Sequence, residues 1–364
     1  MSTNILQDFA YFKAVSQVYF GKNKILKLEN IIKNKKKKYC IIFIDKFFEK
    51  KIDLLKIKFD KTDHIFYLDT SMEPTTELVD KIIYDLKKTE TSMPDLIVGI
   101  GGGSTLDTAK AVSNLLTNPG KAFEYQGWDL IKNKGIYKVG VPTLSGTGAE
   151  ATRTCVLINN QNGLKLGMNS PYTVYDEVIL DPNLTATVSK DQFFYSAMDT
   201  YIHSIESLNG VYRNILADNF SNQALKLSTE ALSSSKILDE DSREKIMIAS
   251  YLGGCAISLS YVGLIHPLSA ALSVVFKTPH CLANCIVMRA MNKYYQKEFD
   301  IFWNLVEKNN IYIPKGICKN SDINELRRLI NSTIIHEKPL TNYFGENFRK
   351  HLTDDLLVNI FKQM

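Results

Sequence analysis

Four residues in the second half of the chain have the side chains and the surroundings of metal ligands. Asp199 and His203 stand four residues apart in SAMDTYIHSIE, so a helix there would place both on one face. His266 and His280 each lie in apolar sequence, within YVGLIHPLS and FKTPHCLANC. A single histidine in such surroundings is more often a hydrogen-bonded core residue than a ligand, but burying all four groups without a shared purpose would cost free energy. We therefore predict one divalent metal site made by Asp199, His203, His266 and His280.

This set of side chains also predicts which metal binds and what it does. A carboxylate with three imidazoles suits Fe²⁺ or Zn²⁺, and affinity order alone does not distinguish the two. With room for a substrate oxygen, the metal would act as a Lewis acid that lowers the pKa of an alcohol.

A run of three glycines separates an apolar strand from a helix in DLIVGIGGGSTLDTAK, residues 95–110. Such a turn aims backbone N–H groups and the positive helix end at an anion, and glycines let a pyrophosphate approach the main chain. We predict a dinucleotide site with Gly102, Gly103, Ser104 and Asp107, in which Ser104 caps the helix. The alternative is a tight turn that needs glycine for a positive φ. The run lacks both the GxGxxG pattern and the lysine of a P-loop.

Asp45 closes an apolar strand at a position that bears on the choice of dinucleotide. There its carboxylate could accept from a ribose 2′-hydroxyl and would repel a 2′-phosphate, which favours NAD over NADP. The alternative role for Asp45 is an N-cap at the end of the strand.

The elements that must position these residues follow from hydrophobic periodicity. In the first half, apolar runs of strand length alternate with helical patterns, which is typical of an α/β layer with a parallel sheet. The runs lie at 39–45, 64–69, 95–100 and 137–143, and the helical patterns at 75–88 and 104–116. From about residue 185 the patterns are helical, at 189–208, 216–235, 243–261, 323–335 and 353–364. The predicted fold is an α/β dinucleotide-binding domain with a parallel, Rossmann-like sheet (1–183), followed by an all-helical metal-binding domain (184–364).

Composition excludes several classes of protein. The formal net charge of +5 over 364 residues is modest, and no basic stripe interleaved with aromatics indicates nucleic acid. No apolar stretch reaches the roughly 18–20 residues of a membrane span, and the N-terminus has no signal-peptide core. The six cysteines are scattered, without a CxxC pair, which favours a reduced, cytoplasmic protein.

Taken in order, the motifs resemble those of the iron-containing, group III alcohol dehydrogenases. They are GGGSTLDTAK (101–110), PTLSGTGAEATRT (142–154), ILDPNLT (179–185), MDTYIHSIES (198–207) and HPLSAALSVVFKTPH (266–280). The resemblance implies the dehydroquinate synthase-like fold of that family, the same four metal ligands and a pyrophosphate loop at Gly102, Gly103 and Ser104. It also implies that Thr143, Leu144 and Thr147 line the nicotinamide and its ribose, and that Lys165 matches the cofactor-side lysine. We expect a homodimer.

With a dinucleotide in place, the loop VPTLSGTGAE (141–150) acquires a purpose. Pro142 would end a strand, Gly146 and Gly148 would keep side chains away from the cofactor, and Ser145 would offer a hydroxyl beside the threonines. We predict that this loop faces the triple glycine as the second wall of the dinucleotide site.

Three positions depart from the family pattern, and a proline after His266 predicts where a helix begins. Ala270 stands where many relatives carry a second histidine, so proton exit must use another group. Pro267 predicts that a helix starts or kinks beside it. Cys281 replaces a usual glycine, and Glu73 replaces a usual asparagine near the adenosine side.

A finer resemblance is to the branch that oxidises the C8 hydroxyl of the sugar acid Kdo before an aminotransferase acts. It is carried by LTNPGKAFEYQGWDLIK (116–132), LGMNSPYTVYDEVILDP (166–182) and HCLANCIVMRAMNKYY (280–295). Tyr125 and Trp128 would then stack on the sugar, and Arg153 would hold its carboxylate. The alternatives are core contacts for the two aromatic residues and a salt bridge at the domain seam for Arg153.

Other functions remain open at this stage. The chain would be an oxidoreductase acting on an alcohol or aldehyde, either for Kdo or for short-chain alcohols in general. A dehydroquinate-synthase-like cyclase or lyase would use NAD only transiently, and that class usually has a Glu/His/His metal site. A noncatalytic nucleotide-binding protein and an oxygen-dependent oxidase are two further alternatives.

Overall fold

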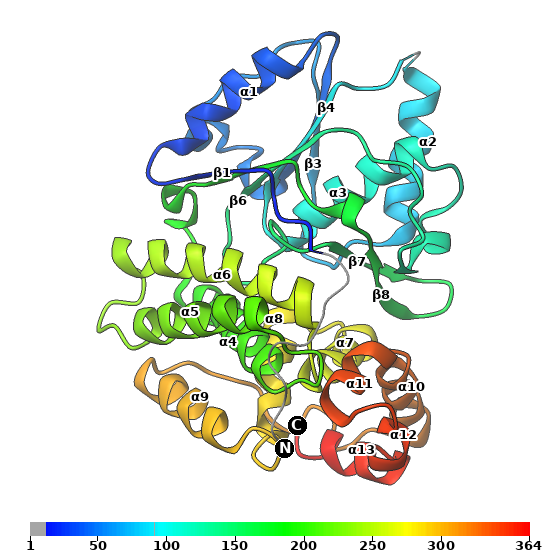
Figure 1. Cartoon of the computed structure of the whole chain (residues 1–364), viewed down its shortest axis with the longest axis vertical. Coiled ribbons are helices and arrows are strands. Elements are labelled where there is room, and N and C mark those ends of the chain that lie inside the picture. Colours follow the sequence, from blue (N-terminus) through cyan, green and yellow to red (C-terminus); the bar gives the residue numbers. More distant parts are fainter. Residues whose placement is uncertain (1–11, 91) are drawn as a thin grey trace. The chain divides into compact units, whose positions relative to one another are not determined.

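The computed structural model describes residues 12–90 and 92–364, which form two compact units (Figure 1). One unit spans Lys13–Val188, and the other contains Phe12 and residues 189–364. The chain changes unit after Val188 instead of after residue 183, because Leu184 still buries its side chain in the core of the first unit. Phe12 belongs with the helices, where its ring lies 6.0 Å from that of Phe220. The predicted membership of residues 1–11 in the first domain falls outside the described residues.

The first unit is built on the parallel sheet that the sequence predicts. Its six strands run in the order β1-β9-β6-β4-β2-β3, and every pairing between them is parallel. Their bounds are β1 Gln17–Phe20, β2 Cys40–Asp45, β3 His64–Leu68, β4 Leu96–Gly101, β6 Lys138–Pro142 and β9 Glu177–Leu180.

Helices cover both faces of this sheet because its central strands are apolar on both faces. Along β2, Ile41 and Phe43 join one core with α2 (Thr76–Thr89) and α3 (Gly103–Thr117). The alternate residues Ile42 and Ile44 join a second core with α1 (Lys27–Lys35). The continuous apolar run of β2 therefore serves two layers of helix.

A smaller sheet in the same unit was not predicted. It has three strands in the order β5-β8-β7, namely β5 Gly127–Trp128, β7 Thr154–Asn159 and β8 Leu164–Asn169. Strands β7 and β8 form an antiparallel hairpin whose turn places Gly163 at φ 66°, a conformation that favours glycine. The hairpin carries Lys165, one of the predicted cofactor residues.

The second unit is helical, as predicted. Its helices are α4 Lys190–Leu208, α5 Ile215–Leu232, α6 Glu240–Ser260, α7 Ile265–Phe276, α8 His280–Val287, α9 Gln296–Lys308, α10 Ile323–Ile334, α11 Glu337–Phe344, α12 Phe348–His351 and α13 Asp354–Phe361. Polar N-caps start the long ones: Ser189 accepts from Gln192 N before α4, and Asp239 accepts from Ser242 N before α6.

Helix α4 packs against both α5 and α6 and carries two of the predicted ligands. The two helices α4 and α6 are close at Gly253 of α6, where a Cβ would make ordinary contacts with Thr200 Cγ2 at 3.4 Å and His203 Cβ at 3.8 Å. Within the described residues, no single helix is both long and apolar enough to span a membrane. Only α6 and α7 taken together, bent by 106°, satisfy the length and composition criteria.

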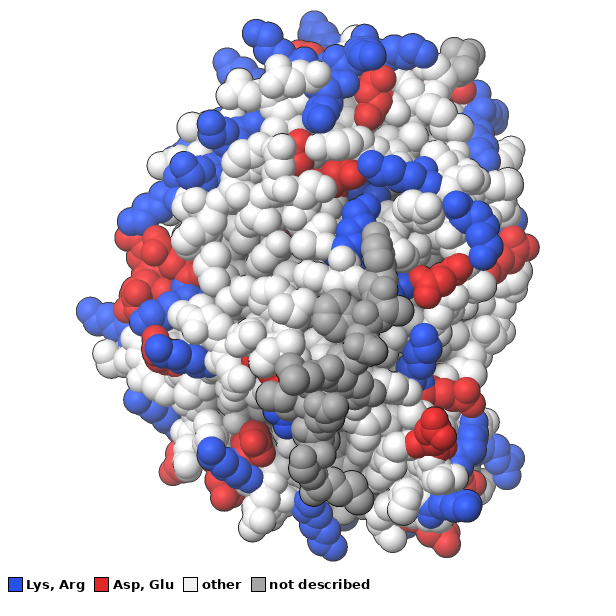
Figure 2. All heavy atoms as spheres, viewed as in Figure 1, with Lys and Arg blue, Asp and Glu red and all other residues white. Residues whose placement is uncertain are grey.

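On the face shown in Figure 2, basic and acidic side chains are interspersed. Lysines gather near α1, whose last turn carries Lys33 and Lys35. Part of the basic run that follows is neutralised locally, because the Lys36 ammonium lies 3.1 Å from a carboxylate oxygen of Asp63.

Candidate functional site

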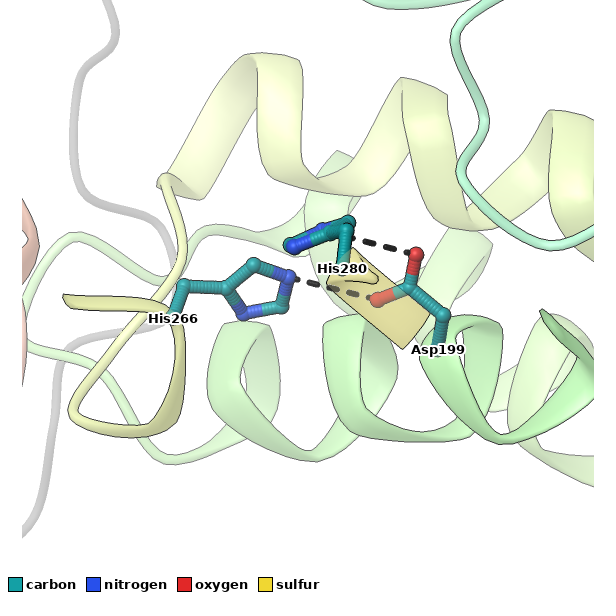
Figure 3. A group of neighbouring side chains, drawn as sticks. All are labelled: Asp199, His266 and His280. Carbon is teal, nitrogen blue, oxygen red and sulfur yellow. Dashed lines mark ion pairs between the residues drawn. The ribbon is translucent and has the colours of Figure 1, made fainter. Parts of the chain in front are cut away.

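Three of the predicted ligands converge in the helical unit (Figure 3). Asp199 comes from the middle of α4, His266 from the start of α7 and His280 from the first position of α8. One ligand atom of each lies within 4.8 Å of the others. His266 Nε2 is 3.4 Å from Asp199 Oδ1, and His280 Nε2 is 3.7 Å from Asp199 Oδ2. These separations are typical of donor atoms that share one cation.

His203, the fourth predicted ligand, lies beside this group. Its Nε2 is 3.7 Å from Asp199 Oδ1, and its ring stacks on that of His266 with centroids 4.6 Å apart. Its Nδ1 is buried and has no hydrogen-bond partner among the described residues. The structure thus gathers all four residues, with His203 outside the compact trio; their role as ligands stays a prediction.

Local sequence explains why α7 and α8 begin where they do. Pro267 is the third residue of α7, where a proline costs nothing because that N–H has no partner within the helix. The predicted helix start beside Pro267 is confirmed. Pro279 is instead the N-cap residue of α8, and each helix has a histidine in its first turn.

The four side chains set one another's protonation. Burial alone would raise the pKa of Asp199, but His203, His280 and His266 outweigh it and hold that pKa well below its usual range. Burial lowers the pKa of His203 to about 4. Burial also acts to lower the pKa of His266, but Glu206 and Asp199 raise it to about 9. Asp199 and His203 are therefore in the protonation states that metal ligation needs, an ionised carboxylate and a neutral imidazole, whereas a binding cation would displace a proton from His266.

Two further residues of the centre escaped the sequence analysis. Glu206 follows His203 by three positions on α4 and contacts the His266 ring at Nδ1. Asn284 follows His280 by four positions on α8, and its Nδ2 donates to Asp199 Oδ1 at 2.6 Å. Helical spacing from each predicted ligand is the signal that could have found both. Cys281, the departure from the family pattern, lies with its sulfur 3.6 Å from Asp199 Oδ2.

In the first unit, β4 leads through Gly102 into α3, as the predicted anion-binding turn requires. Gly102 is the N-cap residue, so the prediction that Ser104 caps the helix is wrong: Ser104 already lies inside α3. A glycine cap offers no side-chain acceptor, and the first N–H groups of α3 have no side-chain cap. Packing also requires a glycine at position 101, because a Cβ there would lie 2.4 Å from Thr105 Oγ1.

The loop after β6 faces the triple glycine, as predicted, whereas its role as a wall of a dinucleotide site stays a prediction. Gly101 pairs with Pro142 across the sheet, and Thr143 N donates to Gly101 O at 3.0 Å. A Cβ on Gly102 would lie 3.5 Å from Leu144 Cβ, and a Cβ on Gly103 would lie 3.1 Å from Thr147 Oγ1.

Two features of this loop would help it to bind a ligand. Gly148 has φ 64°, a conformation that favours glycine and so leaves the turn without a side chain. The Ser145 hydroxyl is buried and finds no partner among the described residues.

The remaining predicted cofactor residues are all engaged within the protein. Asp45 caps a short helix by accepting from Phe47 N at 2.9 Å, and it also accepts from Thr70 Oγ1 at 2.8 Å. The N-cap alternative is therefore what the structure shows, and a ribose contact stays a prediction.

Asp107 and Lys165 lie in the same unit and carry opposite charges. Asp107 Oδ2 accepts from Val156 N at 2.9 Å, and burial raises the Asp107 pKa to about 6. Lys165 pairs with Glu73 at 2.9 Å, so the unusual acidic residue at position 73 faces the predicted cofactor lysine.

The three predicted substrate residues cluster around the small sheet. Tyr125 packs on the core and donates to Pro119 O, as in its core-contact alternative. Trp128 belongs to β5, beside β8. Arg153 makes an ion pair with Asp129 inside this unit. Their contact with a substrate stays a prediction.

Sequence comparison assigns the chain to a family. A family profile described as iron-containing alcohol dehydrogenase matches residues 16–182, and the profile of the C-terminal part of that family matches residues 193–318. The chain belongs to the iron-containing alcohol dehydrogenase family. The two matched regions correspond to the sheet-containing unit and to the helices that carry the metal centre.

Curated relatives match over part of their length. A sulfoacetaldehyde reductase of Bilophila wadsworthia is 34% identical over 221 residues, which is 60% of this chain and 56% of that protein. An NAD-dependent methanol dehydrogenase of Bacillus methanolicus is 31% identical over 196 residues, covering 53% of this chain and 51% of that protein. The chain thus spans little more than half the length of these relatives.

Solved structures share the fold over nearly the whole chain. A 1,3-propanediol oxidoreductase superposes with a TM-score of 0.83 at 20% identity, covering 98% of this chain and 100% of that one. A sulfoacetaldehyde reductase from Bifidobacterium kashiwanohense, in complex with NAD+, gives a TM-score of 0.78 at 21% identity and covers 98% of each chain. The predicted fold class, a parallel α/β domain with a helical C-terminal domain, is confirmed.

Proposed function

We propose that the chain is a metal-dependent oxidoreductase that transfers a hydride between a primary alcohol or its aldehyde and NAD. The observation that carries this proposal is the convergence of Asp199, His266 and His280 within 4.8 Å, in the region that matches the family's C-terminal profile. One carboxylate and the neighbouring imidazoles form a donor set that fits Fe²⁺ or Zn²⁺. A bound ion of either kind supplies a Lewis acid that lowers the pKa of a substrate hydroxyl.

The protein residues at this centre would bind the cation and orient its ligands. Asp199 would hold the cation with an ionised carboxylate, and Asn284 fixes that carboxylate through its hydrogen bond of 2.6 Å. His266 and His280 would add imidazole nitrogens, and we assign His203 as the fourth ligand because its stacked ring already lies against His266. Ala270 offers no proton acceptor, so we assign proton exit to water or to a ribose hydroxyl.

We assign the cofactor to the first unit. The uncapped N–H groups at the start of α3 and the buried Ser145 hydroxyl are donors suited to a pyrophosphate and its riboses. Asp45 favours NAD over NADP through repulsion of a 2′-phosphate. The NAD-dependent methanol dehydrogenase and the NAD+ complex of the sulfoacetaldehyde reductase support this choice.

For the substrate, we propose an anionic primary alcohol or aldehyde, with the C8 hydroxyl of Kdo as the first candidate. The motifs around Trp128 support Kdo, and the similarity to sulfoacetaldehyde reductases supports a small anionic aldehyde. An aminotransferase would consume the Kdo aldehyde. We also propose a cytoplasmic homodimer. A reducing compartment is supported by the six cysteines, all of which are buried and none of which forms a disulfide among the described residues.

A screen for NADH formation tests this proposal. The protein, reloaded with Fe²⁺ or Zn²⁺, would be incubated with NAD and Kdo, 2-hydroxyethanesulfonate or neutral short-chain alcohols. Steady accumulation of NADH on one class supports the proposal. Metal-dependent turnover without net NADH would indicate a cyclase or lyase instead, and peroxide release without NAD would indicate an oxidase.

Arg153→Ala and Asp129→Asn separate anion recognition from structure. Both variants remove the ion pair between these residues, but only the first removes the guanidinium. If Arg153 binds the anion, Arg153→Ala loses activity on the anionic substrate and keeps it on a neutral alcohol, while Asp129→Asn keeps both. Equal loss on both substrates in Arg153→Ala would contradict this role.

A further inference from the structure

The first turn of α7 is satisfied by one side chain from another helix. Leu264, the N-cap residue, makes no side-chain cap, so the first N–H groups of α7 need acceptors elsewhere. Glu206 Oε1 of α4 accepts from Ile265 N at 2.5 Å and from His266 N at 3.3 Å. The third position is Pro267, which has no N–H. A single carboxylate oxygen therefore accepts from both N–H groups that the first three residues of α7 offer.

The other oxygen of the same carboxylate holds the histidine ring. Glu206 Oε2 contacts His266 Nδ1, and the Glu206 side chain is wholly buried. With Nδ1–H donated to the carboxylate, the lone pair of His266 lies on Nε2. That nitrogen is 3.4 Å from Asp199 Oδ1, on the side where the trio converges. Backbone, ring orientation and tautomer of His266 thus depend on one residue.

We propose that Glu206 is the positioning residue that makes His266 competent to bind the metal, and that it supplies the second buried negative charge of the centre. This inference rests on the proposed metal-dependent function. Asp199 and Glu206 together would carry two negative charges, which balance those of a divalent cation. Carboxylates that accept from the outer nitrogen of a ligating histidine raise its basicity and fix its orientation.

A purely structural cap would behave differently from a positioning residue. A cap needs only an acceptor for the two N–H groups, and the amide oxygen of glutamine provides one. In Glu206→Gln, however, the amide NH2 would face His266 Nδ1, which must then accept a hydrogen bond. The proton of the neutral ring would move to Nε2 and block the nitrogen that faces Asp199. The same substitution therefore preserves the cap and reverses the tautomer.

The experiment measures metal affinity apart from catalysis. Metal-free wild-type protein, Glu206→Gln and the control Glu230→Gln would be titrated with Zn²⁺ against a chromogenic chelator, and with Co²⁺ by its visible spectrum. Glu230 also lies in the helical unit, on α5, but is partly exposed and pairs with Lys245. We expect Glu206→Gln to bind about 10- to 100-fold more weakly, with an unchanged melting temperature of the metal-free protein. Glu230→Gln should bind like the wild type.

The outcomes distinguish this inference from the function on which it rests. If wild-type protein binds Zn²⁺ and Glu206→Gln binds it equally well, the positioning role is wrong. If wild-type protein binds neither ion, the proposed function itself fails. Nitrogen NMR of the Zn²⁺-loaded wild type gives an independent measurement that needs no variant at position 206. We expect the proton of His266 on Nδ1, and a proton on Nε2 would overturn the inference.

Discussion

The triple glycine offers a test of the nucleotide site, because packing requires glycine at position 101 but not at the neighbouring position 102. A methyl group on Gly101 would lie 2.4 Å from Thr105 Oγ1 and 2.6 Å from Thr105 Cβ. Rotation of the Thr105 side chain exchanges its two γ atoms but leaves Cβ in place. Since Thr105 is fully buried in the first turn of α3, the backbone itself must move.

The magnitude follows from these distances. Restoring ordinary contact needs a displacement of roughly 1 Å, which overpacking studies associate with a cost of about 1–3 kcal/mol. The entropic gain from replacing glycine by alanine offsets about 0.4–1 kcal/mol of that. We expect Gly101→Ala to lower the free energy of unfolding by about 1–2 kcal/mol.

Gly102→Ala is the matched control. Its new methyl group would meet Leu144 at 3.5 Å, an ordinary contact, and the backbone at φ −77° and ψ −172° suits alanine. Stability should therefore change by less than about 1 kcal/mol. Gly102 stands at the N-cap position of α3, beside N–H groups that have no side-chain cap. A methyl group there would obstruct a phosphate that approaches these groups, so Gly102→Ala should reduce NAD affinity by about tenfold or more.

Urea unfolding followed by circular dichroism would measure the first effect, and calorimetric titration with NAD the second. Equal stability of Gly101→Ala and Gly102→Ala would refute the packing argument. Unchanged NAD affinity in Gly102→Ala would refute the assignment of the anion site to this helix N-terminus.

Two further predictions concern buried charges in the first unit. The buried Lys110 ammonium donates to Thr152 O, Thr152 Oγ1 and Thr154 O at 2.8–3.0 Å. Lys110→Met leaves these acceptors without their donor, so it should lower the free energy of unfolding by about 3 kcal/mol or more in urea titrations. A change below about 1 kcal/mol would contradict this. Asp63 accepts from the Lys36 ammonium and from Cys40 N; burial alone would raise its pKa, but these bonds hold the pKa below its usual value of 3.8. Its ionised form therefore stabilises the fold above pH 3.8, and that stability is lost as the pH falls through the lower folded-state pKa. Asp63→Asn should destabilise the protein by about 1–3 kcal/mol at pH 7 and by progressively less as the pH drops below 3.8; a pH-independent difference between the two unfolding curves would show that charge plays no part.

Much of the architecture could be predicted because it depends on local patterns. The apolar runs of the first half became strands β2, β3, β4 and β6 of a parallel sheet, and Pro267 marked the start of α7. The hairpin of β7 and β8 was missed, because its strands mix buried and partly buried residues and so lack the continuous apolar run of the central strands. Ser104 was assigned as a cap on residue preference alone, but α3 begins at Gly103, so the N-cap position falls two residues earlier, at Gly102.

The predicted site residues show the same division. Spacing of four residues put Asp199 and His203 on one helix face, and the structure has them there. Nothing in the local sequence indicated that Lys165 would pair with Glu73 or Arg153 with Asp129. A charged side chain finds its partner through packing, and several acidic residues were equally available in the sequence.

From the sequence by itself we could predict the helices and strands of the main elements, the glycine-rich turns and the four side chains that we propose as metal ligands. Those features depend on neighbours within about one helical turn, where periodicity and backbone preferences act directly. Only the tertiary structure brought the first turn of α7 against α4, so that Glu206 could satisfy the backbone of Ile265 and hold the ring of His266. Ile265 and His266 lie 59 and 60 positions after Glu206 in the sequence, so they meet it only when the helices pack. The residues that bind could therefore be inferred from local pattern, whereas the residue that orients one of them could not.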